Sequence, residues 1–432
     1  MNQQRVAIIG ATLWGNRGAE AMLVTTIGEI RQRQPNTIFT VYSYFPEADR
    51  RILRDPDIRI FSARPSVLVL SHFVFSLLCW LTGLIGLRFP QALLPESVDN
   101  LRQCDVLLDI NGISFADGRE KFLPFNIMMI WPAMLLKVPV VKLSQAMGPF
   151  NHPLNRISAR LFLKRCRFVY ARGEITAAHL REINFDPGRY TIAADIAFLY
   201  KPEYSLTSEN DETVSRLTAR MDQINHENGV VVGLVVSSVV YAKSQKKKQD
   251  YVGHLLRLMV NLGQAYHFII LPNATRQKMD TPRNNDIFVI NAMRQRADNE
   301  FPKEILDKIE WVDFDINTSS SRTILTRCDL VITSRFHGMI SGLTLGVPTA
   351  VIGWSHKYSE VMSQFGLDEL VVDFSRPDLA QQVITQMIHE TTTIRHSLVT
   401  NLPQVLVSSR KQFDELADLL PRTSSQIATD SQ

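Results

Sequence analysis

Cysteine is scarce in this chain of 432 residues, which holds four: Cys79, Cys104, Cys166 and Cys328. They are widely spaced in apolar segments, and none stands in a Cys-x-x-Cys pair. We therefore expect neither a disulfide framework nor a zinc site built from thiolates. The pattern indicates buried free thiols in a cytoplasmic protein, where disulfides are rare.

An excess of charge of one sign is also lacking. The chain has 47 Lys and Arg against 43 Asp and Glu, a formal net charge of +4. There is no basic stripe with interleaved aromatic residues, so a nucleic-acid partner is not expected. The small positive excess suits a substrate that carries phosphate or carboxylate. No cluster of carboxylates and histidines indicates a metal, and we expect neither a metal nor a bound cofactor.

Two further signals are missing at the N-terminus. The opening MNQQRVAIIG has neither the long apolar core nor the cleavage site of a signal peptide, which agrees with a cytoplasmic location. The glycines after the first predicted strand do not have the G-x-G-x-x-G spacing of dinucleotide-binding proteins.

One apolar run, Val67–Leu87, is long enough to cross a bilayer. A span would place the strands predicted before and after it on opposite sides of the membrane, although they should share one sheet. Two alternatives therefore remain open. The run lies on or partly in the bilayer, at the inner face of the plasma membrane, or it forms a buried core helix.

Short apolar runs that alternate with helical segments predict an α/β fold with two Rossmann-like, doubly wound domains. Hydrophobic residues make up 45% of the chain, as in a globular protein. The predicted strands are Val6–Gly10, Ile38–Ser43, Ile58–Ser62, Val106–Ile110, Val138–Ser144, Phe168–Ala171, Thr191–Ala194, Val230–Ser237, His267–Leu271, Trp311–Phe314, Leu330–Thr333, Thr349–Gly353 and Leu370–Phe374.

The polar stretch between the two sets of strands predicts the domain boundary. We expect an N-terminal domain over residues 1–200, a linker with a surface helix over 201–228, and a C-terminal domain over 229–375. C-terminal helices over 376–420 and a disordered tail over 421–432 complete the prediction. In such folds ligands bind at the carboxyl ends of the strands, and the cleft between the domains is the expected site.

Polar residues follow several predicted strands of the N-terminal half. They are Gly15, Asn16 and Arg17 after the first strand, Asn111, Ser114 and Asp117 after the fourth, Gln145 at the end of the fifth, and Arg172 after the sixth. Glycine at a strand-to-helix junction lets the backbone approach a ligand, although each of these segments can also be a plain turn.

The strongest cluster is Ser334-Arg335-Phe336-His337-Gly338, where a predicted strand ends and a helix begins. Arginine at such a turn can hold phosphate or carboxylate through two parallel hydrogen bonds, and histidine can exchange a proton near neutral pH. A second basic turn, with His356 and Lys357, follows the next strand. The lysine-rich stretch 243–249 is a solvated loop or a contact for an anionic donor or acidic lipid.

The motifs follow one another along the chain as Gly15-Asn16-Arg17-Gly18, Ser114-Phe115, Gln145-Ala-Met-Gly148-Pro149, Ala171-Arg172, and Ser334-Arg335-Phe336-His337-Gly338 with Ser355-His356-Lys357. In this order they resemble the motifs of the polysaccharide pyruvyl transferases of the colanic-acid and cell-wall type. The resemblance covers residues 5–375. It implies a fold of the glycosyltransferase B type, and phosphoenolpyruvate as donor of a pyruvyl group for a sugar of a surface polysaccharide or its lipid-linked precursor.

The resemblance also implies residue roles. His337 matches the catalytic histidine, and Arg335 and Lys357 match donor-binding positions, to which we add Ser334, His356 and Ser237. The N-terminal cluster residues are then acceptor or cleft residues. The chain departs from the family pattern at Asn111-Gly112-Ile113, where consecutive glycines are usual, and at Asn273, where relatives often have histidine. These departures concern the acceptor more than the donor.

Two alternatives stay open. A nucleotide-sugar glycosyltransferase of the same fold usually places a carboxylate near the donor ribose, whereas these turns offer cations and only Glu360 nearby. A non-catalytic component of glycan assembly would keep the fold and bind membranes or partners through Val67–Leu87 without turnover. The acceptor sugar and the oligomeric state do not follow from the sequence.

Overall fold

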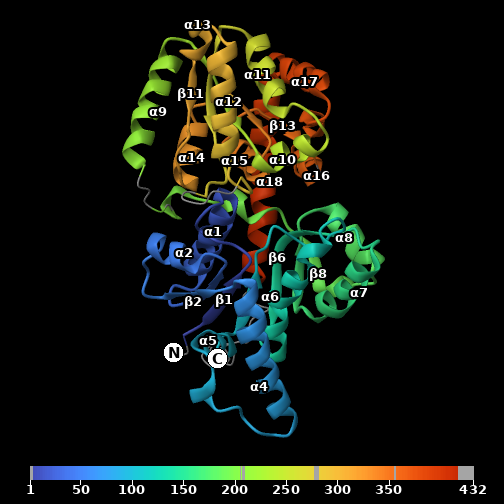
Figure 1. Ribbon diagram of the computed structural model, residues 1–432. Coiled ribbons are helices and arrows are strands. Elements are labelled where there is room, and N and C mark those ends of the chain that lie inside the picture. Colours follow the sequence, from blue (N-terminus) through green and yellow to red (C-terminus); the bar gives the residue numbers. More distant parts are fainter. Residues whose placement is uncertain (1–2, 205, 207–209, 277–281, 355–356, 417–432) are drawn as a thin grey trace, which may run out of the picture. The chain divides into compact units, whose positions relative to one another are not determined.

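The computed structural model describes residues 3–204, 206, 210–276, 282–354 and 357–416. The chain divides into two compact units (Figure 1). Unit 1 comprises Met1–Leu13, Met22–Tyr200 and Leu406–Gln432, and unit 2 comprises Trp14–Ala21 and Lys201–Val405. The residues Trp14–Ala21 thus belong to unit 2, although the predicted boundary near residue 200 placed them in the N-terminal domain.

Unit 1 is built on a parallel sheet with strand order β3-β2-β1-β4-β6-β7-β8. Its strands are β1 (Arg5–Ile9), β2 (Ile38–Ser43), β3 (Ile58–Ser62), β4 (Val106–Asp109), β6 (Val140–Met147), β7 (Phe168–Ala171) and β8 (Tyr190–Ile192), and the short β5 (Ile113–Ser114) pairs with β6. Both β4 and β6 are buried throughout, which explains the apolar run Val106–Leu108, although β6 also buries the polar residues Lys142, Ser144 and Gln145.

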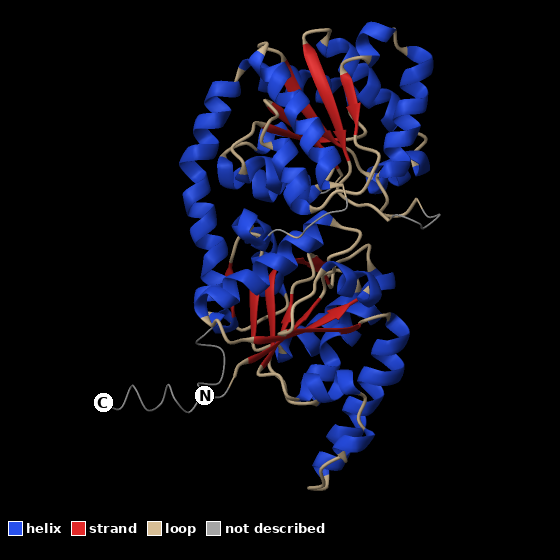
Figure 2. Cartoon of the chain, turned by 90° about the vertical axis from the view of Figure 1, so that its left-hand side faces the viewer, coloured by secondary structure: helices blue, strands red, loops and turns tan. Residues whose placement is uncertain are grey.

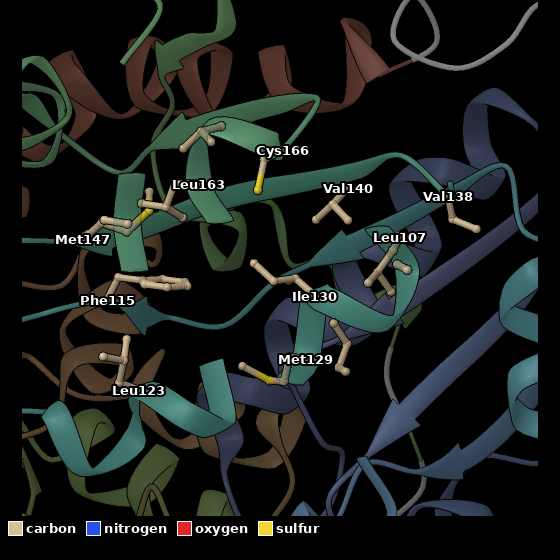
Figure 3. Packing of buried hydrophobic residues seen from close by; sticks show 14 of the residues in the cluster. Leu107, Phe115, Leu123, Met129, Ile130, Val138, Val140, Met147, Leu163 and Cys166 are labelled. Atoms are coloured by element: carbon tan, nitrogen blue, oxygen red, sulfur yellow. The ribbon is translucent and has the colours of Figure 1, made fainter. Parts of the chain in front are cut away.

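Helices of unit 1 connect these strands. They are α1 (Arg17–Arg33), α2 (Pro46–Ile52), α3 (Pro65–Val67), the π-helical turn η1 (Leu68–Phe73), α4 (Val74–Leu84), η2 (Gln91–Leu93), α5 (Glu96–Arg102), η3 (Glu120–Phe122), α6 (Leu123–Leu135), α7 (Pro153–Phe162), η4 (Leu163–Arg165), α8 (Glu174–Glu182), η5 (Pro187–Arg189) and η6 (Ile196–Leu199). Figure 3 shows part of the core, in which Met129 and Ile130 of α6 pack with Leu107 and Val140 of the sheet.

Unit 2 has a second parallel sheet, with strand order β11-β10-β9-β12-β13-β14. Its strands are β9 (Val230–Val235), β10 (Tyr266–Leu271), β11 (Ile309–Trp311), β12 (Leu330–Thr333), β13 (Thr349–Gly353) and β14 (Val371–Asp373). Figure 2 shows helices on both faces of each sheet. The predicted fold class, two Rossmann-like doubly wound domains, is confirmed.

The helices of unit 2 are η7 (Pro202–Tyr204), α9 (Asp211–His226), α10 (Ser238–Lys246), α11 (Tyr251–Leu262), α12 (Ile287–Glu300), α13 (Lys303–Leu306), α14 (Thr318–Leu325), α15 (Phe336–Thr344), α16 (Lys357–Met362), η8 (Ser363–Phe365), η9 (Asp368–Leu370), α17 (Pro377–His389) and α18 (Thr391–Asp414). Side chains cap several of them, as when Asn317 accepts from the Ser320 N–H at the start of α14 (2.8 Å). The last residues of α18, from Leu406, belong to unit 1.

Three local expectations differ from the structure. The lysine-rich stretch begins inside α10 rather than as a loop. The strand β11 ends at Trp311, where the prediction began, because Ile309–Trp311 pair with β10 while Phe314 packs on the core from outside the sheet. Cys104, Cys166 and Cys328 are buried thiols as expected, but Cys79 on α4 is only half-buried.

Candidate functional site

The strand order of unit 2 reverses between β9 and β12, which lie side by side. At such a reversal the connections leave in opposite directions and open a crevice at the carboxyl ends of the strands. Ser237 and Ser238 follow β9 there, and Ser334 and Arg335 follow β12. The structure therefore brings together two segments that are nearly a hundred residues apart in the sequence.

Arg335 precedes the first turn of α15, and its guanidinium is held on one side. Nη2 donates to Ser238 Oγ at 3.0 Å and forms an ion pair with the Asp286 carboxylate. The Arg335 side chain is 12% exposed, whereas Asp286 is fully buried. Nε of Arg335 is buried and has no hydrogen-bond partner among the described residues, so this edge of the fork holds an unsatisfied donor.

Asp286 is the buried residue that organises this corner. Besides the guanidinium, its carboxylate accepts the backbone N–H groups of Ser238 at 2.8 Å, Asn273 at 3.0 Å and Ala274 at 2.8 Å. Sequence reasoning missed it, because a single aspartate in a polar loop gives no signal. Its contacts fix the orientation of Arg335 and the start of α10.

Ser237 and Ser334, two predicted donor-binding residues, are buried and bonded within the protein. Ser237 Oγ accepts from the Val240 N–H at 3.3 Å and caps α10. Tyr251 Oη donates to Ser334 Oγ at 2.7 Å, and burial raises the pKa of the Tyr251 phenol well above its ordinary value. Both serines therefore support the turn from inside.

His337 lies in the first turn of α15 and packs against Gly18 in the first turn of α1. A Cβ atom at Gly18 would lie only 2.0 Å from His337 Nδ1, so any residue but glycine would displace the ring. Gly18 belongs with unit 2, as does the histidine. The two most distinctive motifs of the sequence thus meet within one unit.

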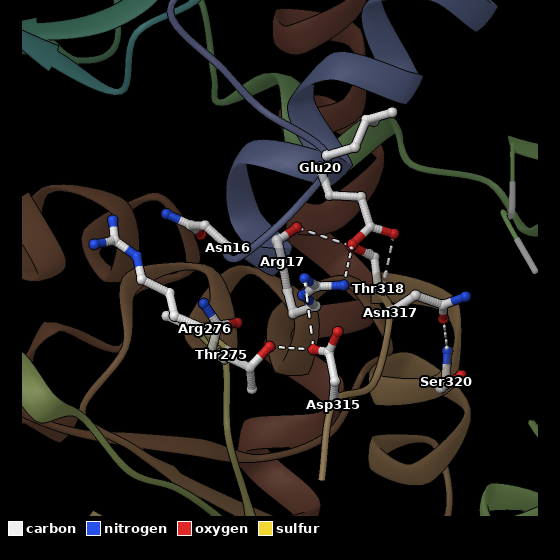
Figure 4. A network of polar contacts seen from close by, with 12 residues as sticks. Asn16, Arg17, Glu20, Thr275, Arg276, Asp315, Asn317, Thr318 and Ser320 are labelled. Atoms are coloured by element: carbon white, nitrogen blue, oxygen red, sulfur yellow. Dashed lines mark hydrogen bonds and ion pairs between the residues drawn. The ribbon is translucent and has the colours of Figure 1, made fainter. Parts of the chain in front are cut away.

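The first turn of α1 is anchored in unit 2 by a polar network (Figure 4). Arg17 is buried, pairs with Glu20 at 2.7 Å and lies 3.7 Å from the Asp315 carboxylate. Glu20 accepts from the Thr318 N–H at 3.1 Å, and Thr318 Oγ1 donates to the Arg17 carbonyl at 2.8 Å. Burial raises the pKa of Glu20, and the Arg17 charge opposes this shift in part.

Gly15 and Asn16 complete this anchor. Asn16 Oδ1 accepts from the Gly18 N–H at 3.0 Å, and the Arg17 N–H donates to the Asn273 carbonyl at 3.0 Å. Gly15 has a φ of +82° and approaches the Thr275 carbonyl. The contacts of Gly15, Asn16 and Arg17 thus position α1 against His337.

The second basic turn contributes Lys357, at the start of α16. Its Nζ lies 4.9 Å from the centre of the Phe336 ring, and the His337 ring packs edge-on against the same ring at 5.2 Å. Lys243 of α10 lies 3.8 Å above the ring of Trp354, which also neighbours Lys357. The predicted donor-binding residue His356 lies outside the described residues.

The predicted acceptor residues of unit 1 bond mainly to one another. Ser114 Oγ donates to Gln145 Oε1 at 2.8 Å, and Gln145 Nε2 donates to the Asp109 carbonyl at 2.6 Å. The Asn111 N–H donates to Asp109 Oδ1 at 3.0 Å. Asp109 in turn forms a fully buried ion pair with Lys142, which sequence reasoning did not single out.

Arg172 and Asp117 also hold unit 1 together. Arg172 pairs with Asp195 at 3.2 Å in a buried position. The Asp117 carboxylate accepts the N–H groups of Asn151 at 2.7 Å and His152 at 3.1 Å just before α7, and the Asn155 amide at 2.8 Å. Burial opposes ionisation of Asp117, but these bonds outweigh it and lower its pKa.

The described part of the chain also has features that bear on two other kinds of site. No group of three or more His, Cys, Asp or Glu residues there is placed to hold a metal ion. A pocket of about 310 Å³ lies between α11 and α17 and is lined by His254, Arg257 and Asp378 among others. It does not include Arg335, His337 or Lys357, so it is separate from the candidate site.

Solved structures show the class of this fold. The chain is similar to a UDP-GlcNAc 2-epimerase from Neisseria meningitidis bound to UDP-GlcNAc, with a TM-score of 0.57 and 12% identity over 95% of this chain and 99% of that one. It is also similar to Anabaena Alr3699/HepE in complex with UDP, with a TM-score of 0.56 and 14% identity over 96% and 100% of the two chains. The architecture is of the glycosyltransferase B type, as predicted.

The sequence comparison is more specific than the fold. Residues 16–356 match the model of the polysaccharide pyruvyl transferase family, and the chain belongs to this family. It is also 22% identical to the amylovoran biosynthesis protein AmsJ of Erwinia amylovora, over 85% of this chain and 88% of that protein. The predicted family is confirmed, together with a role in polysaccharide biosynthesis and transferase activity at the family level.

Proposed function

We propose that this protein transfers a pyruvyl group from phosphoenolpyruvate to a sugar of a surface polysaccharide or its lipid-linked precursor. One observation carries the proposal: after β12, Arg335 and His337 flank Phe336 in the chain, and the His337 ring and the Lys357 ammonium both lie beside the Phe336 ring. A small acid with a phosphate and a carboxylate needs two cationic contacts beside a group that can move a proton. The cytoplasmic location that the sequence predicts belongs to the same proposal, because phosphoenolpyruvate is a cytoplasmic metabolite.

The proposed reaction requires proton transfers and the departure of phosphate, and each step has a residue assigned to it. A proton is added to the methylene carbon of phosphoenolpyruvate, a sugar hydroxyl attacks the neighbouring carbon and loses its proton, and the C–O bond to phosphate breaks. A second hydroxyl then closes a ketal, so two hydroxyl protons end on the new methyl group and on phosphate. His337 performs proton transfers, a role worth about 10²–10⁴-fold in rate.

Arg335 and Lys357 neutralise the donor. A well-placed donor of hydrogen bonds to developing charge is worth about 10²–10³-fold. Asp286 does not touch the substrate in this proposal and acts as a positioning residue, because it holds one edge of the guanidinium. The motif at Gly18 then keeps the His337 ring in place.

A direct assay tests the proposal. The full chain is incubated with phosphoenolpyruvate and candidate lipid-linked or nitrophenyl glycosides, and products are examined by mass spectrometry for a pyruvyl ketal together with released phosphate. We expect product from the wild type, unchanged product from His254→Gln in the separate pocket, and a strong loss in His337→Gln. Equal turnover of His337→Gln and wild type would contradict the assignment of the proton-transfer residue.

The alternative donor is a nucleotide sugar. Of the two structural neighbours, the Neisseria meningitidis protein holds UDP-GlcNAc and the Anabaena protein holds UDP. A ligand that binds the folded protein raises the free energy of unfolding, by about 2.7 kcal/mol when its concentration is a hundred times the dissociation constant. The melting temperature rises as a result. We expect phosphoenolpyruvate to raise the melting temperature and Arg335→Gln to abolish the rise. A shift with UDP-sugars and none with phosphoenolpyruvate would favour glycosyl transfer, and no shift with either would favour the non-catalytic alternative.

A further inference from the structure

The helical run Pro65–Leu84 of unit 1, formed by α3, η1 and α4, turns large apolar side chains outward. Its mean hydropathy is 2.0, and only 17% of it is buried. The exposed side chains include Val69, Leu70, Val74, Leu78, Leu81 and Leu84, and Leu70 is 72% exposed. Contiguous apolar patches of this kind are uncommon on soluble monomers and mark interaction surfaces. The run is therefore not the buried core helix that was one of the two predicted alternatives.

The side of the run that faces the protein combines the apolar Leu68 with two polar residues. His72 and Ser76, four residues apart, are buried, and His72 Nε2 lies 3.0 Å from Ser97 Oγ. Burial lowers the pKa of His72 to about 4, so the ring is neutral at physiological pH. The run thus differs from a surface helix of a soluble protein, which turns polar residues to water, because its outward side is apolar.

The sheet excludes a membrane span for this run. β3 ends just before it and β4 begins after it, and both strands belong to one parallel sheet in the order β3-β2-β1-β4. A single crossing would separate β4 from β1, whose residues pair from Val6 with Val106 to Ile9 with Asp109. An apolar environment such as a bilayer can therefore contact only the outward side of the run.

A second exposed apolar face lies on α7, across α6 from the run. Trp131 of α6 contacts Phe73 at 4.6 Å and Phe162 of α7 at 5.2 Å, so η1 and α7 both pack against α6. On α7, Leu154, Ile157 and Leu161 follow a helical spacing and are about half-exposed. We call these three residues and the outward face of Pro65–Leu84 the α4–α7 surface.

The two chain segments that form this surface carry charges of one sign. From residue 151 to residue 167 the chain has no acidic residue and five exposed cations: Arg156, Arg160, Lys164, Arg165 and Arg167. Between residues 65 and 95 the only formal charge is Arg88. Cations beside an apolar helix complement a bilayer with anionic headgroups, each contributing to membrane binding.

We propose that the α4–α7 surface docks on one leaflet of a bilayer that contains anionic lipids. The apolar face of α4 enters the acyl region, and the arginines of α7 lie at the headgroups. A protein partner is disfavoured, because an interface between proteins carries hydrogen-bonding groups among its apolar ones, and the large exposed side chains of α4 are valine and leucine except for Trp80. The inference is independent of the proposed reaction, since no residue of the candidate site takes part.

Flotation of the purified full chain with vesicles tests this proposal. We expect the chain to bind vesicles that contain phosphatidylglycerol more tightly than vesicles of phosphatidylcholine alone. Arg156→Gln/Arg160→Gln should weaken binding to the anionic vesicles about 25-fold, about fivefold for each guanidinium. Leu81→Ser/Leu84→Ser should weaken binding to both kinds of vesicle by about tenfold for each side chain.

Matched variants control for unspecific effects. Arg216→Gln/Arg257→Gln and Val399→Ser remove exposed residues of unit 2, and should leave binding unchanged. Melting temperatures equal to that of the wild type show that each variant is folded. Brominated lipids should quench the fluorescence of Trp80, and Trp80→Phe should remove this quenching.

Three outcomes overturn the proposal. The wild type does not float with anionic vesicles, or Arg156→Gln/Arg160→Gln binds them as well as the wild type does. In the third, light scattering shows a dimer that Leu81→Ser/Leu84→Ser dissociates while vesicle binding persists, which would make the surface a contact between two copies. Because the readout is binding and not turnover, failure here leaves the proposed reaction untouched, and the reverse also holds.

Discussion

The carboxyl ends of the central strands differ between the two units, although both sheets reverse their strand order at the same place. In unit 1, β1 and β4 lie side by side and Lys142 pairs with Asp109, and both side chains are fully buried. In unit 2, β9 and β12 lie side by side and Arg335 pairs with buried Asp286 while its own side chain stays partly exposed. The same strand arrangement thus holds a fully buried ion pair in one unit and a partly exposed one in the other.

Packing explains why the crevice of unit 1 is closed. A Cβ atom at Gly10, which follows β1, would lie 2.6 Å from the backbone nitrogen of Asn111, so the chain segments after β1 and β4 touch. In unit 2 the corresponding segments carry Ser238 and Arg335, which meet through side chains. Strand order alone therefore does not distinguish the two units, whereas the exposure of the charged partner does.

The largest effect on activity should come from unit 2, at the carboxyl end of β12. His337→Gln removes the side chain that we propose moves protons, and the rate of pyruvyl transfer should fall by about 10²–10⁴-fold. Steady-state kinetics with phosphoenolpyruvate and a competent acceptor measure the change in kcat. His254→Gln is the matched control in the same unit, and a similar loss in that variant would mean that the effect is not specific to the site.

Breaking the Asp109–Lys142 ion pair of unit 1 should lower the stability of the protein instead of its activity. Asp109→Leu or Lys142→Met leaves one buried charge without its partner, which should lower the free energy of unfolding by about 3–5 kcal/mol. The double variant removes both charges and should recover most of this loss. Urea denaturation of the three variants tests the idea, and additive losses in the double variant would contradict it.

Arg335→Lys keeps a charge beside Asp286 but loses the planar fork. We expect kcat/KM for phosphoenolpyruvate to fall by about 10²–10³-fold, because a lysine offers a point charge and cannot bind in the bidentate way. Stability should change little, since the buried carboxylate keeps a cation. A large drop in melting temperature with unchanged kcat/KM would make Arg335 a structural residue like Lys142, and would erase the difference between the two units.

The smallest effect concerns Asp117 in unit 1. Its pKa is lowered in the folded protein, so its contribution to stability is present above the ordinary aspartate pKa of about 3.9 and is lost as the pH falls through the lower folded value. Asp117→Ala should cost about 0.5–2 kcal/mol at pH 7, as for a lost helix cap, and much less near pH 3. Melting curves at both values measure this, with exposed Glu182→Ala as the control, and an equal cost at both values would refute it.

Much of the fold could be predicted because buried parallel strands are continuous apolar runs. β2, β3, β7, β12 and β13 have the predicted bounds. β5 could not be predicted, because two residues that pair with β6 give no periodic pattern. The predicted position of β11 was displaced toward the C-terminus, because the hydrophobic residues Trp311, Val312 and Phe314 have the pattern of a strand. Among them only Trp311 is in register with β10.

The candidate site could be predicted in part. Arg335, His337 and Lys357 directly follow strands, and that position is visible in the sequence. The role of Asp286 was not visible, since it reaches Arg335 and Ser238 from a loop that precedes α12. Nor was the place of Arg17, whose partners Asp315 and Thr318 lie some three hundred residues further along the chain. Contacts of that range depend on tertiary structure and leave no local pattern.

The membership of Trp14–Ala21 in unit 2 limits how evolution can reuse this fold. A recombination event that transferred only the coding region for residues 201–405 would deliver a unit without the α1 turn that covers Asp315 and Thr318 and supports the His337 ring. A complete unit 2 therefore needs a short upstream segment as well, and an exchange of the two halves at the linker alone yields chimaeras in which that turn comes from the other parent.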